Sequence, residues 1–212
     1  MILNKPTYSE SYDFFNTVYE NGKQLDLSQC VYGLFHDNKT VLGTSPYYYF
    51  LAGLAEKLKA AKIIEIGTYR GGSTKALAAG MLAGGKSGQI LTFDVKNFNP
   101  DFANFYHYIT HHIGYPTLPE SIEKAMIMFE GETIDILFID AAHEKSSTLI
   151  QTLLYDRLFT PRCLIWDDIS INKTMMEFQK IARIIYPEMI DVSQICPHIR
   201  RPSEGFGVWM RF

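Results

Sequence analysis

The stretch that decides the fold is Lys62-Ile-Ile-Glu-Ile-Gly-Thr-Tyr-Arg-Gly-Gly-Ser-Thr74. An apolar run of strand type takes in a single carboxylate, Glu65, and breaks at Gly67. The chain then turns and enters a helix through Gly71-Gly72-Ser73-Thr74. A strand, a glycine turn and a helix start together present backbone N–H groups to a ligand at the helix N-terminus. The sequence therefore predicts a ligand-binding turn between a strand and a helix.

Strands and helices alternate after this turn. Apolar runs predict strands at residues 63–66, 89–95, 108–113, 134–139 and 163–166, and helical periodicity predicts helices at 73–82, 119–129, 146–159 and 173–185. Such alternation indicates an α/β fold with a doubly wound, mostly parallel, seven-stranded Rossmann-like sheet. No helix separates the last two apolar runs, 189–195 and 206–212, so we expect a C-terminal antiparallel hairpin at one sheet edge.

The N-terminal part of the sequence shows helical signals and no alternation of strands with helices. Residues 9–19 carry aromatic and apolar side chains near helical spacing, and the turn signal Asn21-Gly22 follows them. Ser45-Pro46 is a typical helix start, with Ser as N-cap and Pro at the first position. The stretch between these two helices is mixed and predicts no element. We expect a helical cap segment over residues 1–45 and one α/β domain over 46–212.

Composition limits the class of partner. The chain of 212 residues is 47% hydrophobic and 20% charged with a net charge of −3, whereas a nucleic-acid-binding surface needs a basic excess. Cys30, Cys163 and Cys196 are widely separated, which predicts free thiols in a reducing compartment. The N-terminus does not resemble a signal peptide, and no apolar run approaches the roughly 20 residues of a membrane span. We therefore expect a soluble, cytoplasmic protein with neither a membrane nor a nucleic-acid partner.

Acidic residues gather where the predicted strands end. Glu65 lies in the first strand, Asp94 and Asp140 end two later ones, and Asp167-Asp168 follow another. In a parallel sheet, ligands bind beyond the carboxyl ends of the strands. Two like charges about 4 Å apart repel by roughly 4 kcal/mol at an effective dielectric constant of 20. Converging carboxylates therefore shift their pKa values or recruit a cation.

The glycine spacing separates two ligand classes. A dinucleotide fingerprint is G-x-G-x-x-G, whose close glycines let the backbone approach a pyrophosphate. Here bulky Tyr69 lies between Gly67 and Gly71-Gly72, and Glu65 would repel a diphosphate. The pattern indicates a ligand with an ammonium group and no phosphate, which describes S-adenosylmethionine. A tight turn that binds nothing is the alternative interpretation of the same glycines.

Each part of S-adenosylmethionine has a candidate partner in this sequence. Glu65 would accept from its amino group, directly or through water, and the turn amides with the helix N-terminus opened by Ser73 would take its carboxylate. Asp94 would accept both ribose hydroxyls. For Asp94 the alternative is an ordinary cap of a turn, whereas an unpartnered structural Glu65 would bury a carboxylate at high cost.

Three sequence blocks resemble known families. Glu65-Ile-Gly67-Thr-Tyr69-x-Gly71-x-Ser73 is similar to the first motif of class I S-adenosylmethionine-dependent O-methyltransferases of the catechol type. Phe138-Ile-Asp-Ala-Ala-His143, followed by Trp166-Asp167-Asp168, looks still more like the macrocin-type sugar O-methyltransferases. The resemblance covers roughly residues 60–170. It implies that the methyl donor binds at Glu65, Gly67, Thr68, Tyr69, Gly71, Ser73, Asp94 and Asp140.

The resemblance also implies a divalent cation, usually Mg²⁺, that holds the hydroxyl groups of the acceptor. Asp140, Asp167 and Asp168 match the positions of its ligands, and hard oxygen donors are what Mg²⁺ takes. Neighbours in a regular strand point to opposite faces. Asp167 and Asp168 can therefore share one ion only if the strand ends there, and otherwise one of them caps the next turn.

His143 lies three residues after Asp140. Catechol-type enzymes carry a lysine base at this spacing, and macrocin-type ones resemble this sequence in having histidine. A histidine near a cation can take the proton of a metal-bound hydroxyl during methyl transfer. We therefore expect Asp140 and His143 to be catalytic; the alternative for His143 is a polar residue at the start of the following helix.

The predicted function is an S-adenosylmethionine-dependent O-methyltransferase, assisted by a divalent metal, that acts on a small hydroxylated acceptor such as a sugar or a vicinal diol. The alternatives are a metal-independent methyltransferase and an S-adenosylmethionine-binding module without catalysis. A nicotinamide-dependent oxidoreductase is disfavoured by the glycine spacing. The oligomeric state stays open, although apolar N-terminal helices often pack on a partner subunit in a homo-oligomer.

Overall fold

The computed structural model describes residues 8–30, 32–36, 39–196 and 204–211. Its helices are α1 (Tyr8–Gly22), α2 (Pro46–Leu58), α3 (Gly72–Ala83), α4 (Pro119–Phe129), α5 (Lys145–Phe159) and α6 (Lys173–Ile185). Its strands are β1 (Tyr32–His36), β2 (Lys39–Gly43), β3 (Lys62–Ile66), β4 (Gln89–Asp94), β5 (Ile109–Ile113), β6 (Ile136–Ile139), β7 (Cys163–Asp167), β8 (Ile190–Asp191) and β9 (Phe206–Met210).

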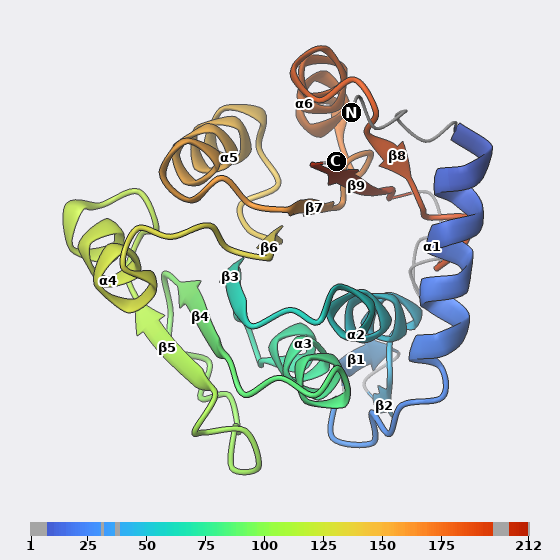
Figure 1. Ribbon diagram of the computed structural model, residues 1–212, viewed down its shortest axis with the longest axis vertical. Coiled ribbons are helices and arrows are strands. Elements are labelled where there is room, and N and C mark those ends of the chain that lie inside the picture. Colours follow the sequence, from blue (N-terminus) through green and yellow to red (C-terminus); the bar gives the residue numbers. More distant parts are fainter. Residues whose placement is uncertain (1–7, 31, 37–38, 197–203, 212) are drawn as a thin grey trace, which may run out of the picture.

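A seven-stranded sheet in the order β5-β4-β3-β6-β7-β9-β8 forms the centre of the molecule (Figure 1). The strands from β5 to β7 are parallel to one another, and β9 pairs antiparallel with both β7 and β8. The doubly wound sheet and its C-terminal antiparallel hairpin are thereby confirmed. The chain runs outward from β3 to one edge and then returns to β6 beside β3, so the strand order reverses between β3 and β6.

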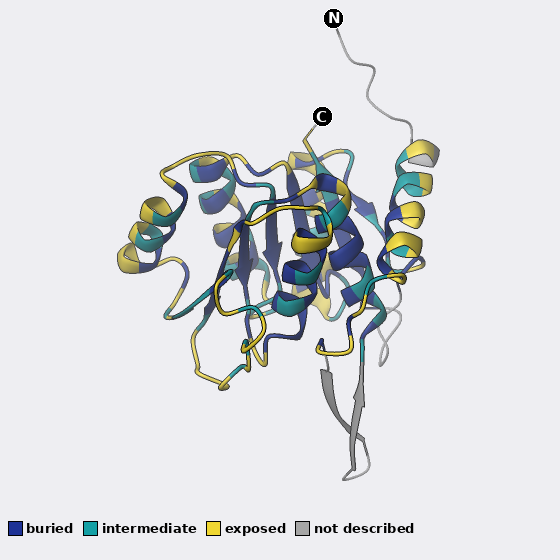
Figure 2. Ribbon diagram, turned by 60° about the horizontal axis from the view of Figure 1, so that its bottom comes forward, coloured by how far each residue is buried: buried dark blue, intermediate teal, exposed yellow. Residues whose placement is uncertain are grey.

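Helices cover both faces of the sheet, and each face has its own hydrophobic core. One core joins α1, α2 and α3 to side chains such as Ile63, Ile90 and Phe138. The other joins α4, α5 and α6 to neighbouring side chains such as Ile64 and Leu91. Because alternate residues of a strand point to opposite faces, continuous apolar runs serve both cores. The interiors of the central strands are therefore buried, whereas the edge strand β5 is only partly buried and most exposed residues lie on helices and loops (Figure 2).

Local signals fix the helix ends. Pro46 and Pro119 stand at the first positions of α2 and α4, where a missing N–H costs nothing. The Asn172 side chain caps α6 by accepting from the backbone N–H of Met175, 2.9 Å away. Ser45 occupies the N-cap position of α2, as predicted, although its hydroxyl makes no capping hydrogen bond.

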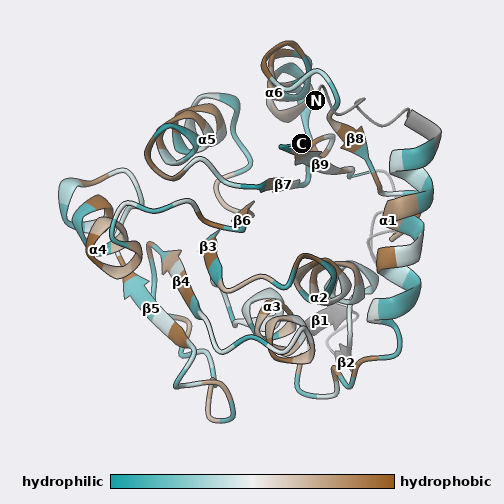
Figure 3. Ribbon diagram, viewed as in Figure 1, coloured by the Kyte–Doolittle hydropathy of each residue, from teal (hydrophilic) through white to brown (hydrophobic). Residues whose placement is uncertain are grey.

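The N-terminal helix α1 packs directly on α2. A side chain at Gly22 would overlap the backbone of Tyr49, and one at Gly53 would overlap that of Val18, so glycines allow the two helix backbones to touch. The antiparallel pair β1–β2 follows α1 and was not predicted. Helix α1 alternates hydrophilic and hydrophobic positions (Figure 3), and no helix among the described residues is long and apolar enough to cross a membrane.

Candidate active site

The glycine turn after β3 is built by close backbone contact. Gly67 has a φ of +109°, and a side chain there would overlap the carbonyl oxygen of Asp140. Its N–H donates to the carbonyl of Phe93 at 2.8 Å. Gly71, with a φ of +75°, is the N-cap of α3, and no side chain caps that helix. The first turn of α3 therefore keeps its anion-binding capacity for another group.

A small cavity of about 30 Å³ lies at this helix start. It brings together most of the residues predicted to bind the methyl donor, with two tyrosines of α2. Its lining consists of Tyr47, Tyr48, Gly67, Thr68, Tyr69, Arg70, Gly72, Ser73 and Asp140.

Glu65 is fully buried beneath the turn and lines neither this cavity nor the larger one described below. Ser73 donates to its Oε1 at 2.5 Å, while Thr92 at 2.6 Å and Thr74 both donate to Oε2. The hydroxyls of Thr68 and Thr92 lie 2.7 Å apart, which links the turn to the same group. Burial raises the pKa of Glu65 to about 7, although the three hydroxyl donors oppose this shift. The carboxylate thus holds the turn, and its contact with a ligand stays a prediction.

Asp94, at the end of β4, is held by two backbone amides. The N–H of Tyr69 donates to its Oδ2 at 2.7 Å, and the N–H of Lys96 donates to Oδ1 at 3.0 Å. Tyr69 has a φ of +45°, an unusual conformation for a residue with a side chain. Each carboxylate oxygen has a second lone pair. Asp94 is therefore oriented by the turn and can still accept from a pair of hydroxyls.

Four carboxylates gather beyond β6 and β7. Strand β7 ends at Asp167, and Asp168 follows with a φ of +54°, so both side chains line the same cavity. The N–H of Asp168 donates to Asp167 Oδ1 at 2.9 Å. After burial, the charges of Asp140 and Glu204 are among the causes that raise the pKa values of both Asp167 and Asp168, so the four carboxyl groups act on one another. We call Asp140, Asp167, Asp168 and Glu204 the carboxylate cluster.

Charge repulsion and burial favour the protonated forms of this cluster. Burial, and next the charge of Asp94, raise the pKa of Asp140. Burial and then Asp140 raise the pKa values of Asp167 and Asp168. His143 acts in the opposite direction and lowers the pKa of Asp168. The cluster therefore favours any positive charge placed beside it.

His143 lies between two members of the carboxylate cluster. Its Nε2 is 3.8 Å from Asp140 Oδ1 and 3.5 Å from Asp168 Oδ2, and about a third of its side chain is exposed. Ala142 and His143 both have positive φ values, 55° and 39°. Asn172 donates from Nδ2 to the His143 carbonyl at 2.9 Å and so supports this loop. Strained, supported backbone of this kind is concentrated at functional sites.

A cavity of about 460 Å³ at the carboxyl edge of the sheet joins these features. It runs from the loop after β5, past Asp94 and the glycine turn, to the carboxylate cluster. Its lining consists of Tyr47, Ile66, Gly67, Tyr69, Phe93, Asp94, Val95, Tyr115, Pro116, Asp140, Ala141, Ala142, His143, Ser147, Gln151, Asp167 and Asp168.

Three residues of this site were not predicted. Tyr47 from α2 lines both cavities, Glu204 precedes β9, and Gln151 lies on α5. None belongs to a short motif, and only the fold brings them to the sheet edge. The run Tyr47-Tyr48-Tyr49 is the one signal in the sequence that could have found Tyr47, because such aromatic side chains either line a pocket or pack in a core.

A metal site was predicted from Asp140, Asp167 and Asp168. In the described part of the chain, no three His, Cys, Asp or Glu side chains are already arranged as metal ligands. The donor chemistry nevertheless suits a hard cation. Asp168 Oδ1 is buried and has no hydrogen-bond partner among the described residues, which is what a missing positively charged group would leave.

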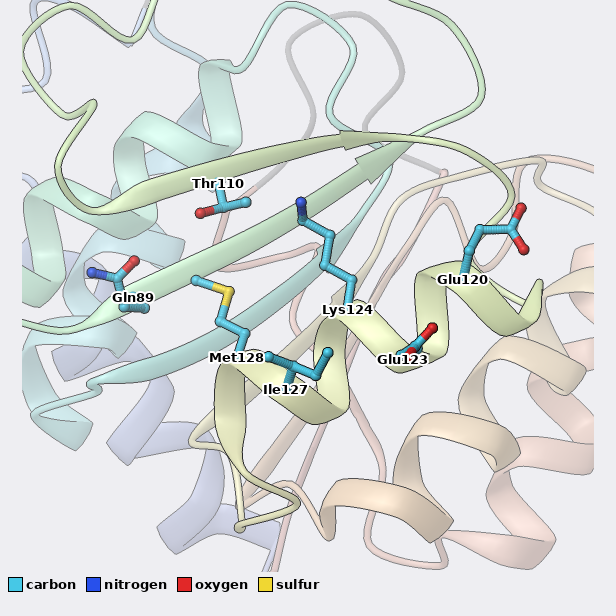
Figure 4. A pocket seen from close by; sticks show the side chains of 7 residues that line it. All are labelled: Gln89, Thr110, Glu120, Glu123, Lys124, Ile127 and Met128. Atoms are coloured by element: carbon cyan, nitrogen blue, oxygen red, sulfur yellow. The ribbon is translucent and has the colours of Figure 1, made fainter.

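A third cavity, of about 620 Å³, lies apart from these groups between α4 and the edge strand β5 (Figure 4). Side chains of both charges and two apolar residues line it: Gln89, Thr110, Glu120, Glu123, Lys124, Ile127 and Met128. It contains none of the predicted site residues.

The fold and the cavity of about 460 Å³ define a class of protein: a doubly wound α/β protein with a cavity at the switch point of its sheet, where such folds bind their ligands. Residues 64–169, half of the chain, match the family described as a methyltransferase domain. The chain belongs to this family and is an S-adenosylmethionine-dependent methyltransferase.

Solved structures share the fold along nearly the whole chain. An O-methyltransferase of Bacillus cereus in complex with SAH is 18% identical, with a TM-score of 0.56 over 99% of this chain and 94% of that one. A putative O-methyltransferase of Klebsiella pneumoniae is 19% identical, with a TM-score of 0.56 over 100% and 93%. The O-methyltransferase TomG of Streptomyces achromogenes is 16% identical, with a TM-score of 0.59 over 99% and 92%. No curated protein sequence gives a significant match.

Proposed function

We propose that this methyltransferase acts on oxygen: it transfers the methyl group of S-adenosylmethionine to a hydroxyl of a small acceptor, with assistance from Mg²⁺. The observation that carries the proposal is one cavity that joins Asp94 and the glycine turn to His143 and the carboxylate cluster. The proposed donor site at Asp94 and the glycine turn therefore opens into the same cavity as His143 and the carboxylate cluster, which would accept a proton and attract positive charge. The solved O-methyltransferases with this fold are consistent with oxygen as the atom methylated.

The donor would bind along the edge from β4 to β6. Asp94, oriented by two amides, would accept from the ribose hydroxyls. The uncapped start of α3 would bind the methionine carboxylate. Asp140 lines both cavities and lies beside the turn, so it would accept from the methionine ammonium group, with Glu65 acting from beneath through Ser73 and Thr74.

His143 is the proposed general base. Its Nε2 faces Asp140 and Asp168, so the positive charge that it gains with the acceptor proton would be stabilised by both. Oxygen attack on the sulfonium methyl then needs only alignment of two bound reactants, and positioning of this kind supplies much of the rate.

Asp140, Asp167 and Asp168 would hold Mg²⁺. Their oxygens are the ligand type that Mg²⁺ takes, and the unpaired Oδ1 of Asp168 is available to it. When bound, Mg²⁺ lowers the pKa of a coordinated hydroxyl and fixes its orientation. A pair of neighbouring hydroxyls, as in a sugar or a vicinal diol, fits such a site because both oxygens can face the cation.

A metal-independent reaction is the second candidate, and the position of His143 favours it. When neutral His143 takes the proton of the acceptor, the imidazolium that forms would lie between Asp140 and Asp168 and would supply the positive charge that the cluster attracts. The two mechanisms make opposite predictions for chelation. Activity should fall with exhaustive removal of divalent metal and return with Mg²⁺ if the metal takes part, and should be unchanged if His143 alone serves.

The N-terminal residues 1–45 are proposed as a cap segment that helps to form the acceptor pocket next to the domain at 46–212. Helix α1 packs on α2, and α2 carries Tyr47 into the cavity, so the cap and the site are connected. A homo-oligomer formed through this segment is compatible with the proposal.

Transfer of a radioactive methyl group from S-adenosylmethionine to a panel of sugars and vicinal diols tests the function. We expect product with at least one hydroxylated acceptor, and loss of product in His143→Ala with donor affinity retained. Binding of the donor without methyl transfer to any acceptor would contradict oxygen methylation and favour a binding module. Methyl transfer to water-soluble amines only would contradict it as well and favour a different acceptor atom.

A further inference from the structure

Helix α5 lines one side of the cavity of about 460 Å³ at the carboxyl edge of the sheet. Ser147, Gln151 and Tyr155 succeed each other at intervals of four residues and so share one face of α5. The Tyr155 hydroxyl donates to the carbonyl of Pro116 at 2.8 Å, which ties α5 to the loop after β5. Ser147 and Gln151, one and two turns nearer the helix start, line the cavity itself.

Gln151 carries an unpaired acceptor on this side of the cavity. The residue is only 5% exposed. Its Nε2 donates to Ser147 Oγ at 3.2 Å, whereas its Oε1 is buried and has no partner among the described residues. A buried polar atom without a partner is costly, so a ligand group that donates a hydrogen bond to this oxygen would remove that cost.

The place of Gln151 along the sheet edge shows which part of a nucleoside it would meet. Asp94 ends β4, and the carboxylate cluster follows β6 and β7 on the other side of β3. A ligand whose ribose is at Asp94 and whose charged tail points toward the cluster must place its base on the β5 side. Phe93, Tyr115 and Pro116 form flat and apolar walls there, together with Gln151.

We propose that Gln151 determines the base specificity of the methyl donor: its Oε1 accepts a hydrogen bond from the 6-amino group of adenine. This inference rests on the proposed donor site and adds a residue that no sequence motif indicated. Gln151 lines the cavity, its amide nitrogen is taken up by Ser147, and its amide oxygen is the acceptor left without a partner among the described residues. A purine without a 6-amino donor leaves that oxygen unpaired, so Gln151 selects adenosyl over other nucleosyl ligands.

The test compares two ligands by calorimetry on the full chain: S-adenosylhomocysteine and its analogue in which hydrogen replaces the 6-amino group. In the wild type we expect the analogue to bind about tenfold more weakly, the effect of one neutral hydrogen bond to a buried acceptor. In Gln151→Met, which keeps the length of the side chain but has no acceptor, we expect both ligands to bind within about twofold of each other.

The control is Gln89→Met, the same substitution in the separate cavity of Figure 4. It should keep the tenfold preference, and thermal unfolding of all three proteins checks that they are folded. A wild type that binds both ligands equally, or a Gln151→Met variant that retains the full preference, overturns the role of Gln151 while leaving the donor site intact. A wild type that binds neither ligand overturns the proposed function, and the role of Gln151 with it.

Discussion

Replacing Glu65 by Gln should change how the stability of the protein depends on pH. Glu65 is fully buried, and its pKa is raised from 4.5 to about 7, first by burial. Between these two pH values the folded protein keeps a proton that the unfolded chain releases. Stability from the protonated carboxyl is therefore fully present below pH 4.5, declines as pH rises toward 7, and is constant above it.

The size of the decline follows from the pKa values. A difference of one unit in pKa corresponds to about 1.4 kcal/mol, so the rise in the pKa of Glu65 from 4.5 to about 7 corresponds to about 3 kcal/mol. Glu65→Gln has no proton to lose. The free energy of unfolding of the wild type, minus that of Glu65→Gln, should thus fall by about 3 kcal/mol between pH 4.5 and pH 7.5.

Urea unfolding followed by tryptophan fluorescence measures both proteins, because Trp166 is fully buried and reports loss of the core. The carboxylate cluster is present in both, so its own titration largely cancels in the difference. Glu123→Gln, which removes an exposed carboxylate on α4, controls for the loss of one negative charge. Parallel stability curves for wild type and Glu65→Gln would refute the claim that burial of Glu65 governs its ionisation.

Three further substitutions have definite expected outcomes. Gly67→Ala should destabilise the protein by about 3 kcal/mol or more in urea unfolding, because the methyl group overlaps the Asp140 carbonyl, whereas Gly85→Ala, also at positive φ but in open space, should cost only about 1 to 2 kcal/mol. His143→Ala should lower turnover by about 10²- to 10⁴-fold with unchanged affinity for S-adenosylhomocysteine; unchanged turnover would remove it as the base. Asp168→Asn should weaken activation by Mg²⁺ in a titration of activity against metal, and an unaltered titration would argue for the metal-independent reaction.

The elements of the α/β part could be predicted because local signals mark their ends. Predicted and observed bounds coincide for α4 and α6, where Pro119 begins one helix and Asn172 caps the other. The strand predicted at 134–139 begins later, at Ile136, although the N–H of Asp135 already donates to the carbonyl of Lys62 at 2.8 Å. The antiparallel pair β1–β2 was missed, since two strands of only five residues each leave little periodicity to detect.

The site was predictable where its residues follow a strand directly, as Asp94 and Asp140 do. Its other contacts depend on tertiary structure. Thr92 reaches Glu65 because β3 and β4 pair in the register that places these two residues side by side. Gln151 reaches the cavity because α5 packs over the loop after β5. A sequence pattern carries neither the strand register nor the packing of a helix on a distant loop.

The central claim is that the cavity at the carboxyl edge of the sheet binds the methyl donor through Asp94 and the glycine turn. Calorimetric titration of S-adenosylhomocysteine into wild type and Asp94→Asn tests it most directly. We expect one ligand per chain, about tenfold weaker binding in Asp94→Asn, whose hydrogen bonds to the ribose lack a charged acceptor, and no binding of NAD. Absence of binding to the wild type, equal binding by the two proteins, or a preference for NAD would contradict the claim.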